Sequence, residues 1–77
     1  MSKPLRNISR RATIAALTKL GFEVIDGRGK GSHALIVHPE DRSRRSTLPR
    51  RDPVAVGTLR GILRDLGISR EEFEQAI

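Results

Sequence analysis

The spacing of apolar residues near the N-terminus is that of a helix with one buried face. Ile14, Leu17 and Leu20 recur at intervals of three positions, which places them on one side of an α-helix. Ser9 can cap the amides of the first turn, and Gly21 is typical of the position just after a helix. The pattern therefore predicts a helix from near residue 9 to residue 20. The basic residues of this segment lie off the apolar stripe and are expected to form a solvated face: Arg10, Arg11 and Lys19.

Three extended segments follow this helix. Residues 22–26 and 32–38 have the composition of strands, and the glycine-rich residues 27–31 join them as a turn. Residues 44–48 form a third, weakly apolar strand, which follows a polar hairpin connection at residues 40–43. Because charged residues deter unwanted pairing, we expect this third strand to lie at the edge of the sheet.

A second amphipathic helix is predicted after a loop at residues 50–57. Its apolar positions keep the i, i+3, i+4, i+7 spacing of one buried face: Leu59, Ile62, Leu63 and Leu66. Thr58 is the expected N-cap and Gly67 the expected stop signal. Ser69 and Glu72 have the spacing of a capping box, which predicts a short last helix.

The predicted order of elements is α-β-β-β-α with a short C-terminal helix. The corresponding fold class is α+β, with a three-stranded antiparallel sheet that carries its helices on one face. This is the plan of a double-stranded-RNA-binding domain. A chain of 77 residues is long enough for one small core, so we expect a single domain over residues 1–77, in which residues 1–7 form a mobile leader.

The charge balance indicates an anionic partner. Lysine and arginine outnumber aspartate and glutamate by 15 to 9, and 12 of the 15 cations are arginine. Such an excess favours nucleic acid, an acidic protein or a membrane surface as partner. The planar guanidinium of arginine favours phosphate among these. Phe22 and Phe73 are the only aromatic residues of the Phe, Tyr and Trp types, so the chain offers no aromatic platform for stacking several bases.

The residue types and patterns that the sequence lacks exclude several kinds of site. The absence of cysteine excludes disulfides, zinc–cysteine sites and thiol catalysis, and it fits a reducing cytoplasm. No stretch approaches the roughly 20 apolar residues that span a bilayer, and no secretory signal is present. The two histidines and the scattered carboxylates lack the spacing of a metal site. We therefore predict a cytoplasmic protein without a membrane segment, a metal or a cofactor.

The glycine-rich turn carries the candidate chemistry. His33 follows it directly, and histidine is the side chain that most readily gives and takes a proton near neutral pH. Arg28 and Lys30 supply charge for a phosphate, Gly31 lets the backbone approach a ligand, and Ser32 can donate a hydrogen bond. A Walker loop is excluded, because it needs Ser or Thr after the lysine. The alternative reading is a tight, solvated β-turn with no role in catalysis.

Cleavage of an RNA strand fits this group of residues. The 2′-hydroxyl must lose a proton, the phosphate must accept extra negative charge, and the leaving 5′-oxygen must gain a proton. His33 can perform one of the proton transfers as catalytic residue, while Arg28 and Lys30 stabilise the developing charge. These steps need no metal. A second reading keeps the same basic face for a non-catalytic RNA-binding module, and a third makes the charge serve an acidic protein partner alone.

A second group of arginines brackets the predicted third strand. It comprises Arg42, Arg44, Arg45, Arg50 and Arg51. If these residues follow a phosphate backbone, RNA binding should weaken steeply with salt. We predict RNA contacts for Arg44, Arg45, Arg50 and Arg51. The alternative is a solvated edge strand and loop.

Several motifs resemble those of a known family. They are Leu20-Gly-Phe, Arg28-x-Lys-Gly-Ser-His33, Thr47-x-Pro49, Gly57-Thr-Leu-x-x-Ile-Leu63 and Leu66-Gly-Ile-Ser, followed by Phe73. In this order and spacing they resemble HicA-type toxins, from about residue 9 to residue 76. Gly-Ser-His alone is a weak signal, and its combination with the later motif makes the resemblance specific.

The resemblance implies a small messenger-RNA interferase of a type II toxin–antitoxin system, with a double-stranded-RNA-binding-like fold. It implies that a HicB-type antitoxin holds the enzyme inactive, that mRNA is the substrate, and that cleavage arrests growth. His33 would be the catalytic residue, and Gly31 and Ser32 would share its site. The family often carries a histidine shortly after the proline of the third strand. Here Arg50 and Arg51 follow that proline, which suggests that arginine takes over the phosphate contact.

Overall fold

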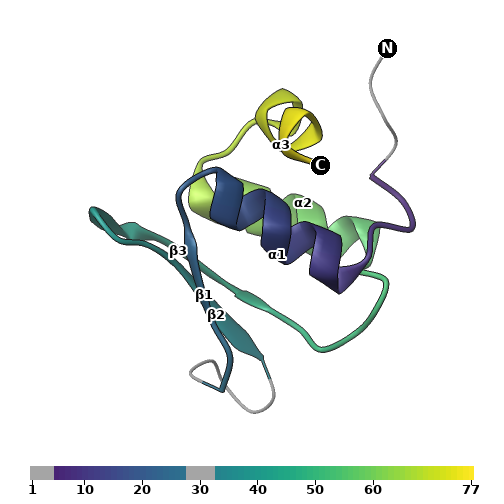
Figure 1. The fold of residues 1–77 in the computed structure, drawn as a ribbon, viewed down its shortest axis with the longest axis horizontal. Helices are drawn as coiled ribbons and strands as arrows, with labels where there is room; N and C mark the ends of the chain where they lie inside the picture. Colours follow the sequence, from purple (N-terminus) through teal and green to yellow (C-terminus); the bar gives the residue numbers. More distant parts are fainter. Residues whose placement is uncertain (1–4, 28–32) are drawn as a thin grey trace.

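The computed structural model describes residues 5–27 and 33–77, and it has the predicted order of elements (Figure 1). These elements are α1 (Arg10–Lys19), β1 (Glu23–Ile25), β2 (Ala34–His38), β3 (Asp41–Leu48), α2 (Val56–Leu66) and α3 (Arg70–Ala76). The strands form one antiparallel sheet in the order β1-β2-β3. The α+β fold class and the edge position of the third strand are therefore confirmed.

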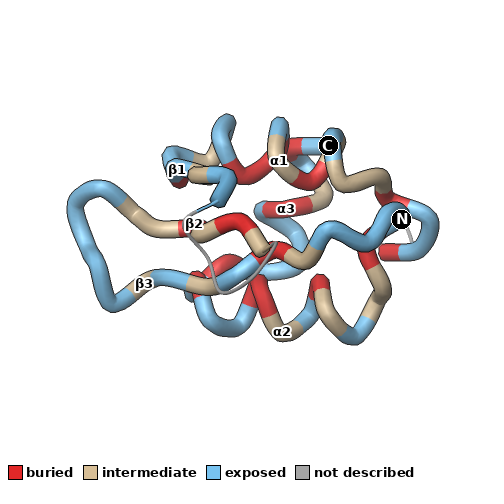
Figure 2. The backbone as a smooth tube through the Cα atoms, turned by 90° about the horizontal axis from the view of Figure 1, so that it is seen from below, coloured by how far each residue is buried: buried red, intermediate tan, exposed pale blue. Residues whose placement is uncertain are grey.

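The helices cover one face of the sheet. Seen from below, α1 lies on the side of β1 and α2 lies on the side of β3 (Figure 2). α3 packs against α1 on the side away from the sheet (Figure 1). The largest fully buried apolar side chains come from all three helices and from the two longer strands: Phe73, Leu17, Ile36, Leu48, Leu59 and Leu66. The arrangement with helices on one face is thus as predicted. None of the described helices covers the opposite face of the sheet.

The third strand is longer than predicted. It begins at Asp41, which pairs with His38, so the connection between β2 and β3 is only a two-residue turn. Residues 40–43 were expected to be a polar connection. The polar composition hid this part of the strand, because the end of β3 near the hairpin is exposed and has no apolar alternation for a pattern to detect.

Two helix starts agree with the sequence and one does not. Ser9 accepts a hydrogen bond from the Ala12 amide at 2.9 Å, as expected for the N-cap of α1. The capping box at the start of α3 is also present. However, α2 begins at Val56 with Ala55 as N-cap and no side-chain hydrogen bond, so the prediction of Thr58 was wrong. A bridge between Ile8 and Val54 fixes the chain just before α2, and no local pattern signals such a long-range contact.

The N-terminal segment joins the core earlier than predicted. Residues 1–4 lie outside the described part of the chain, but Leu5 is only 4% exposed and Ile8 only 8%. The Val54 amide donates to the Ile8 carbonyl at 2.9 Å. The leader predicted at residues 1–7 is therefore packed against the domain from Leu5 onwards.

The described helices were also compared with the dimensions of a bilayer. Within residues 5–27 and 33–77, none of them is long and apolar enough to cross a membrane.

Candidate active site

The predicted phosphate-binding turn falls largely outside the described residues. Arg28, Lys30, Gly31 and Ser32 all belong to residues 28–32, for which the structure gives no description. His33 is the first described residue after them, directly before β2. The geometry of the candidate site is therefore built from His33 and from the strand ends around it.

His33 lies at the end of the sheet where both outer strands terminate beside the central one. Ile25, the last residue of β1, pairs with Leu35, and Leu48, the last residue of β3, pairs with Ala34. Since His33 directly precedes Ala34, it lies next to the point at which β1 and β3 end. Among the described residues, neither outer strand extends past His33 at this end of the sheet.

His33 as a whole is half-buried, so part of the residue is exposed to solvent. Its Nδ1 is shielded from solvent and lacks a hydrogen-bond partner, and it is the only buried side-chain nitrogen or oxygen in this state among the residues the structure describes. Buried polar atoms are normally satisfied. The unpartnered Nδ1 of His33 is therefore an exception to this rule among the described residues, which marks His33 as a candidate functional residue.

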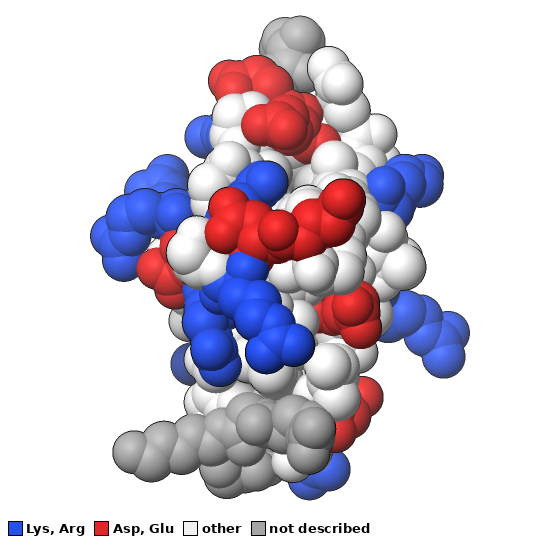
Figure 3. All heavy atoms as spheres, turned by 90° about the vertical axis from the view of Figure 1, so that its left-hand side faces the viewer, with Lys and Arg blue, Asp and Glu red and all other residues white. Residues whose placement is uncertain are grey.

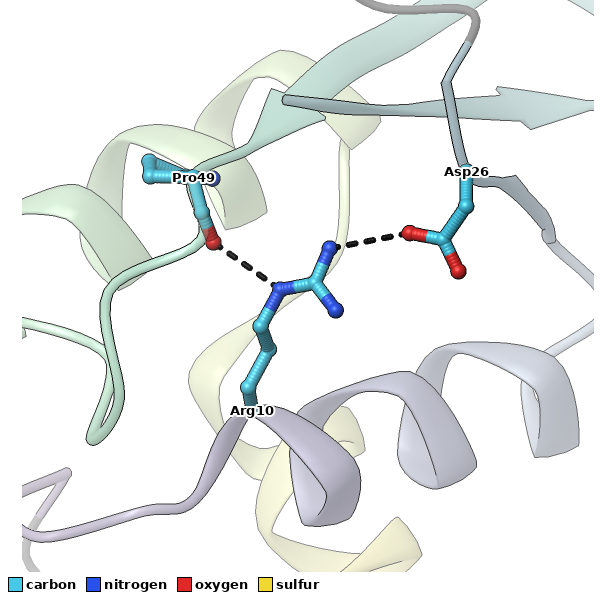
Figure 4. Close-up of polar contacts among 3 residues, drawn as sticks. All are labelled: Arg10, Asp26 and Pro49. Carbon is cyan, nitrogen blue, oxygen red and sulfur yellow. Dashed lines mark hydrogen bonds and ion pairs between the residues drawn. The ribbon is translucent and has the colours of Figure 1, made fainter. Parts of the chain in front are cut away.

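Arg10 connects the strand ends that flank His33 (Figure 4). Its Nε donates to the Pro49 carbonyl at 3.0 Å, just after β3, and its Nη2 donates to Asp26 Oδ1 at 3.1 Å, just after β1. Its backbone N–H donates to Asp52 Oδ1 at 3.0 Å. The side chain is only 19% exposed, so the expectation of a solvated face was wrong for Arg10. Sequence reasoning missed this residue because its three partners are 16, 39 and 42 positions away.

Arg44 is engaged within the domain. Its Nε donates to the Leu66 carbonyl at 2.7 Å, at the end of α2, and its guanidinium lies 5.1 Å from the centre of the Phe22 ring. Arginine near a helix C-terminus satisfies free carbonyls and complements the helix dipole. The structure thus gives Arg44 a role in packing, which sets it apart from the other arginines predicted to contact RNA.

Those other arginines are exposed but lie in different places. Arg45 lines a depression on the open face of the sheet, together with residues that include Val37 and Arg42. Arg50 and Arg51 follow β3 and line separate hollows, Arg50 with Arg10 and Arg11 and Arg51 with residues near Val54. None of these three makes a hydrogen bond or ion pair within the described ranges. The sequence grouped the arginines together, and the fold separates them.

The surface charge is also mixed rather than of one sign. The face at the left of Figure 1 carries lysine and arginine side chains around a central band of acidic ones (Figure 3). The basic excess of the chain therefore does not form a uniform patch on this side.

The second histidine has a structural environment. His38 Nδ1 accepts a hydrogen bond from the Glu40 amide at 3.1 Å, in the turn between β2 and β3. Its ring packs edge-on against Phe22, with the ring centres 5.2 Å apart. His38 stabilises the hairpin, so the candidate chemistry stays with His33.

No group of three or more histidine or carboxylate side chains that could hold a metal ion occurs within the described ranges. The expectation of a site without metal or cofactor stays a prediction.

A comparison with family models gives one match, to the family described as HicA toxin of bacterial toxin–antitoxin, over residues 10–68. Comparisons with curated proteins and with solved structures gave no match. The matched segment covers α1, the whole sheet and α2, and it includes His33 and Arg10. The chain therefore belongs to the HicA toxin family of bacterial toxin–antitoxin systems.

Proposed function

We propose that this toxin is a metal-independent endoribonuclease that cleaves mRNA in the cytoplasm, with His33 as general acid or base. The observation that carries the proposal is the half-buried residue His33 at the end of the sheet, whose Nδ1 has no partner among the described residues. Membership of a toxin family supports it, because degradation of messenger RNA explains growth arrest.

The reaction needs proton transfer and charge stabilisation together. His33 takes the proton of the attacking 2′-hydroxyl or delivers one to the leaving 5′-oxygen. Arg28, Lys30, Gly31 and Ser32 precede it in the chain and are the proposed contacts to the reacting phosphate. Arg50 and Arg51 follow the strand end nearest to His33 and are exposed, which suits contacts to neighbouring phosphates.

A HicB-type antitoxin is the proposed inhibitor. The family establishes that an antitoxin exists, and the net charge of +6 favours an acidic partner surface that is attracted over a distance. Covering the end of the sheet would keep RNA away from His33.

Replacing His33 tests the proposal directly. The variants His33→Ala and His33→Gln should lower the rate of RNA cleavage by about 10²–10⁴-fold and should abolish growth arrest on induction. The rate is measured on purified protein with a labelled RNA in the presence of a chelator. Lys19→Ala is a suitable control, because Lys19 lies at the opposite end of α1 from Arg10.

Thermal unfolding of each variant checks that the fold is intact. Cleavage by His33→Ala at the wild-type rate would defeat the assignment of His33. RNA that is bound by the wild-type protein but never cut would instead favour the non-catalytic RNA-binding module.

A further inference from the structure

The Arg10 side chain bonds to two segments that lie far from it in the sequence. Arg10 is the first residue of α1, and its guanidinium reaches under the end of the sheet, between the segments that follow β1 and β3. These two segments flank the start of β2, where His33 lies. One side chain therefore ties both neighbours of the His33 strand to the same helix (Figure 4).

The geometry of the two bonds depends on the planar guanidinium. Nε and Nη2 belong to one rigid group and donate to two acceptors on the segments that follow β3 and β1, at 3.0 Å and 3.1 Å. A lysine ammonium keeps the charge but lacks this fixed fork. The two contacts therefore link Pro49 and Asp26 through one rigid group, and they do more than balance the charge of Asp26.

The ion pair with Asp26 is expected to contribute little to stability. Asp26 is 75% exposed, and exposed ion pairs contribute about 0.2–1 kcal/mol. The backbone N–H of Arg10 bonds to Asp52, and the N-cap at Ser9 is separate from the guanidinium. A substitution of the side chain leaves both of these intact. The side chain can therefore be tested without removing the start of α1.

From this geometry we infer that Arg10 is a positioning residue. It holds the ends of β1 and β3, and with them the start of β2, so that His33 lies at a fixed place relative to the Pro49 carbonyl and the arginines that follow. The inference rests on the proposed function, since His33 is the residue that is being placed. Small displacements of a catalytic group are costly, because a shift of about 1 Å can reduce a rate by about 100-fold.

The decisive comparison is between Arg10→Lys and Arg11→Lys. Both variants keep the net charge, both lie in the first turn of α1, and Arg11 makes no side-chain hydrogen bond within the described ranges. Arg10→Lys should lower kcat for RNA cleavage by at least about tenfold, while KM changes by less than about twofold. Arg11→Lys should leave kcat at the wild-type value. Asp26→Asn should also lower kcat, but by less than Arg10→Lys does.

A second measurement does not depend on cleavage. In the free protein, the NMR signals of the His33 ring should shift in Arg10→Lys and should stay in place in Arg11→Lys. All assays are run below the unfolding temperature of every variant. If the wild-type protein does not cut RNA, the proposed function fails. The NMR signals of the His33 ring then still show whether Arg10 fixes the position of His33. Unchanged ring signals, a wild-type kcat, or a change in KM alone would overturn the positioning role.

Discussion

Arg44 and Arg45 are adjacent in β3, and their side chains lie on opposite faces of the sheet because side chains alternate along a strand. Arg44 points to the helices, where it contacts the Leu66 carbonyl and the Phe22 ring. Arg45 lies on the open face, among the residues that line its depression. Residue type and charge are the same in the two cases. The position in the pleat therefore decides that Arg44 packs within the domain and that Arg45 stays exposed, as its proposed RNA contact requires.

This difference predicts opposite effects of truncation. Arg44→Ala should lower the free energy of unfolding by about 1–2 kcal/mol, because it removes a charged hydrogen bond and a cation–π contact. Arg45→Ala should change it by no more than about 0.5 kcal/mol. Urea denaturation of the two variants measures both values. Equal losses of stability would contradict the assignment of Arg44 to packing.

At the scale of elements, the helices begin in different ways. α1 and α3 each have a serine N-cap that bonds to a backbone amide, whereas α2 follows Ala55 without a side-chain cap. In α3, Ser69 Oγ accepts from the Glu72 amide at 3.1 Å, and Glu72 Oε1 accepts from the Ser69 amide at 3.0 Å. A helix of only 7 residues depends on such a cap, and α3 places the fully buried Phe73 in the core.

The capping box of α3 should make stability depend on pH. Its hydrogen bonds, first that from the Ser69 amide, hold the pKa of Glu72 below its ordinary value of 4.5. The folded state therefore favours the carboxylate, and this contribution is fully present above the ordinary pKa and is lost as pH falls through the lowered one. Asp41 acts in the same direction, since the Ser43 hydroxyl and then the Ser43 amide lower the pKa of its carboxyl group.

We therefore expect the unfolding temperature to fall between about pH 5 and about pH 2. Glu72→Gln keeps a capping side chain without a titrating group and should reduce this fall. Ser69→Ala should cost about 1 kcal/mol at neutral pH. Thermal unfolding followed by circular dichroism across the pH range measures both effects. If the unfolding temperature of Glu72→Gln fell by as much at low pH as that of the wild-type protein, Glu72 would be excluded as the cause.

At the scale of the whole molecule, the fold brings three distant segments to one end of the sheet. The end of β1, the start of β2 and the end of β3 meet there, and the first residue of α1 bonds to two of them. The other end of β2 and β3 is closed by the hairpin that contains His38. His33 and the loop with Arg50 and Arg51 thus lie at the end of the sheet where β1 and β3 terminate.

Binding of RNA at this end should depend on salt through particular arginines. Each phosphate contact to a single strand adds about 0.7 to the slope of log affinity against log salt. Replacing Arg50 and Arg51 together by alanine should therefore lower that slope by about 1.4. The measurement uses a non-cleavable RNA analogue at several salt concentrations. Arg64→Ala is the control, because Arg64 is exposed in the last turn of α2, away from this loop. An equal change in the control would remove Arg50 and Arg51 from the interface.

The sequence by itself determined the elements and the family. Helix faces, the stop at Gly67 and the capping box at Ser69 were predicted correctly, because each depends on neighbours within a few positions. The candidate His33 came from the same local reading. The start of α2 and the length of β3 were not predicted, since a bridge to Ile8 and a pairing with β2 decide them.

Only the tertiary structure decided what the arginines do. Arg10 was expected in solvent and is instead bonded to residues 16 and 39 positions away through its guanidinium. Arg44 and Arg45 were grouped by sequence and separated by the pleat of the sheet. Hydrophobic periodicity reports which face of an element is buried, but it carries no information on which distant carbonyl or carboxylate lies within reach of a long polar side chain. That depends on strand register and on how the helices pack.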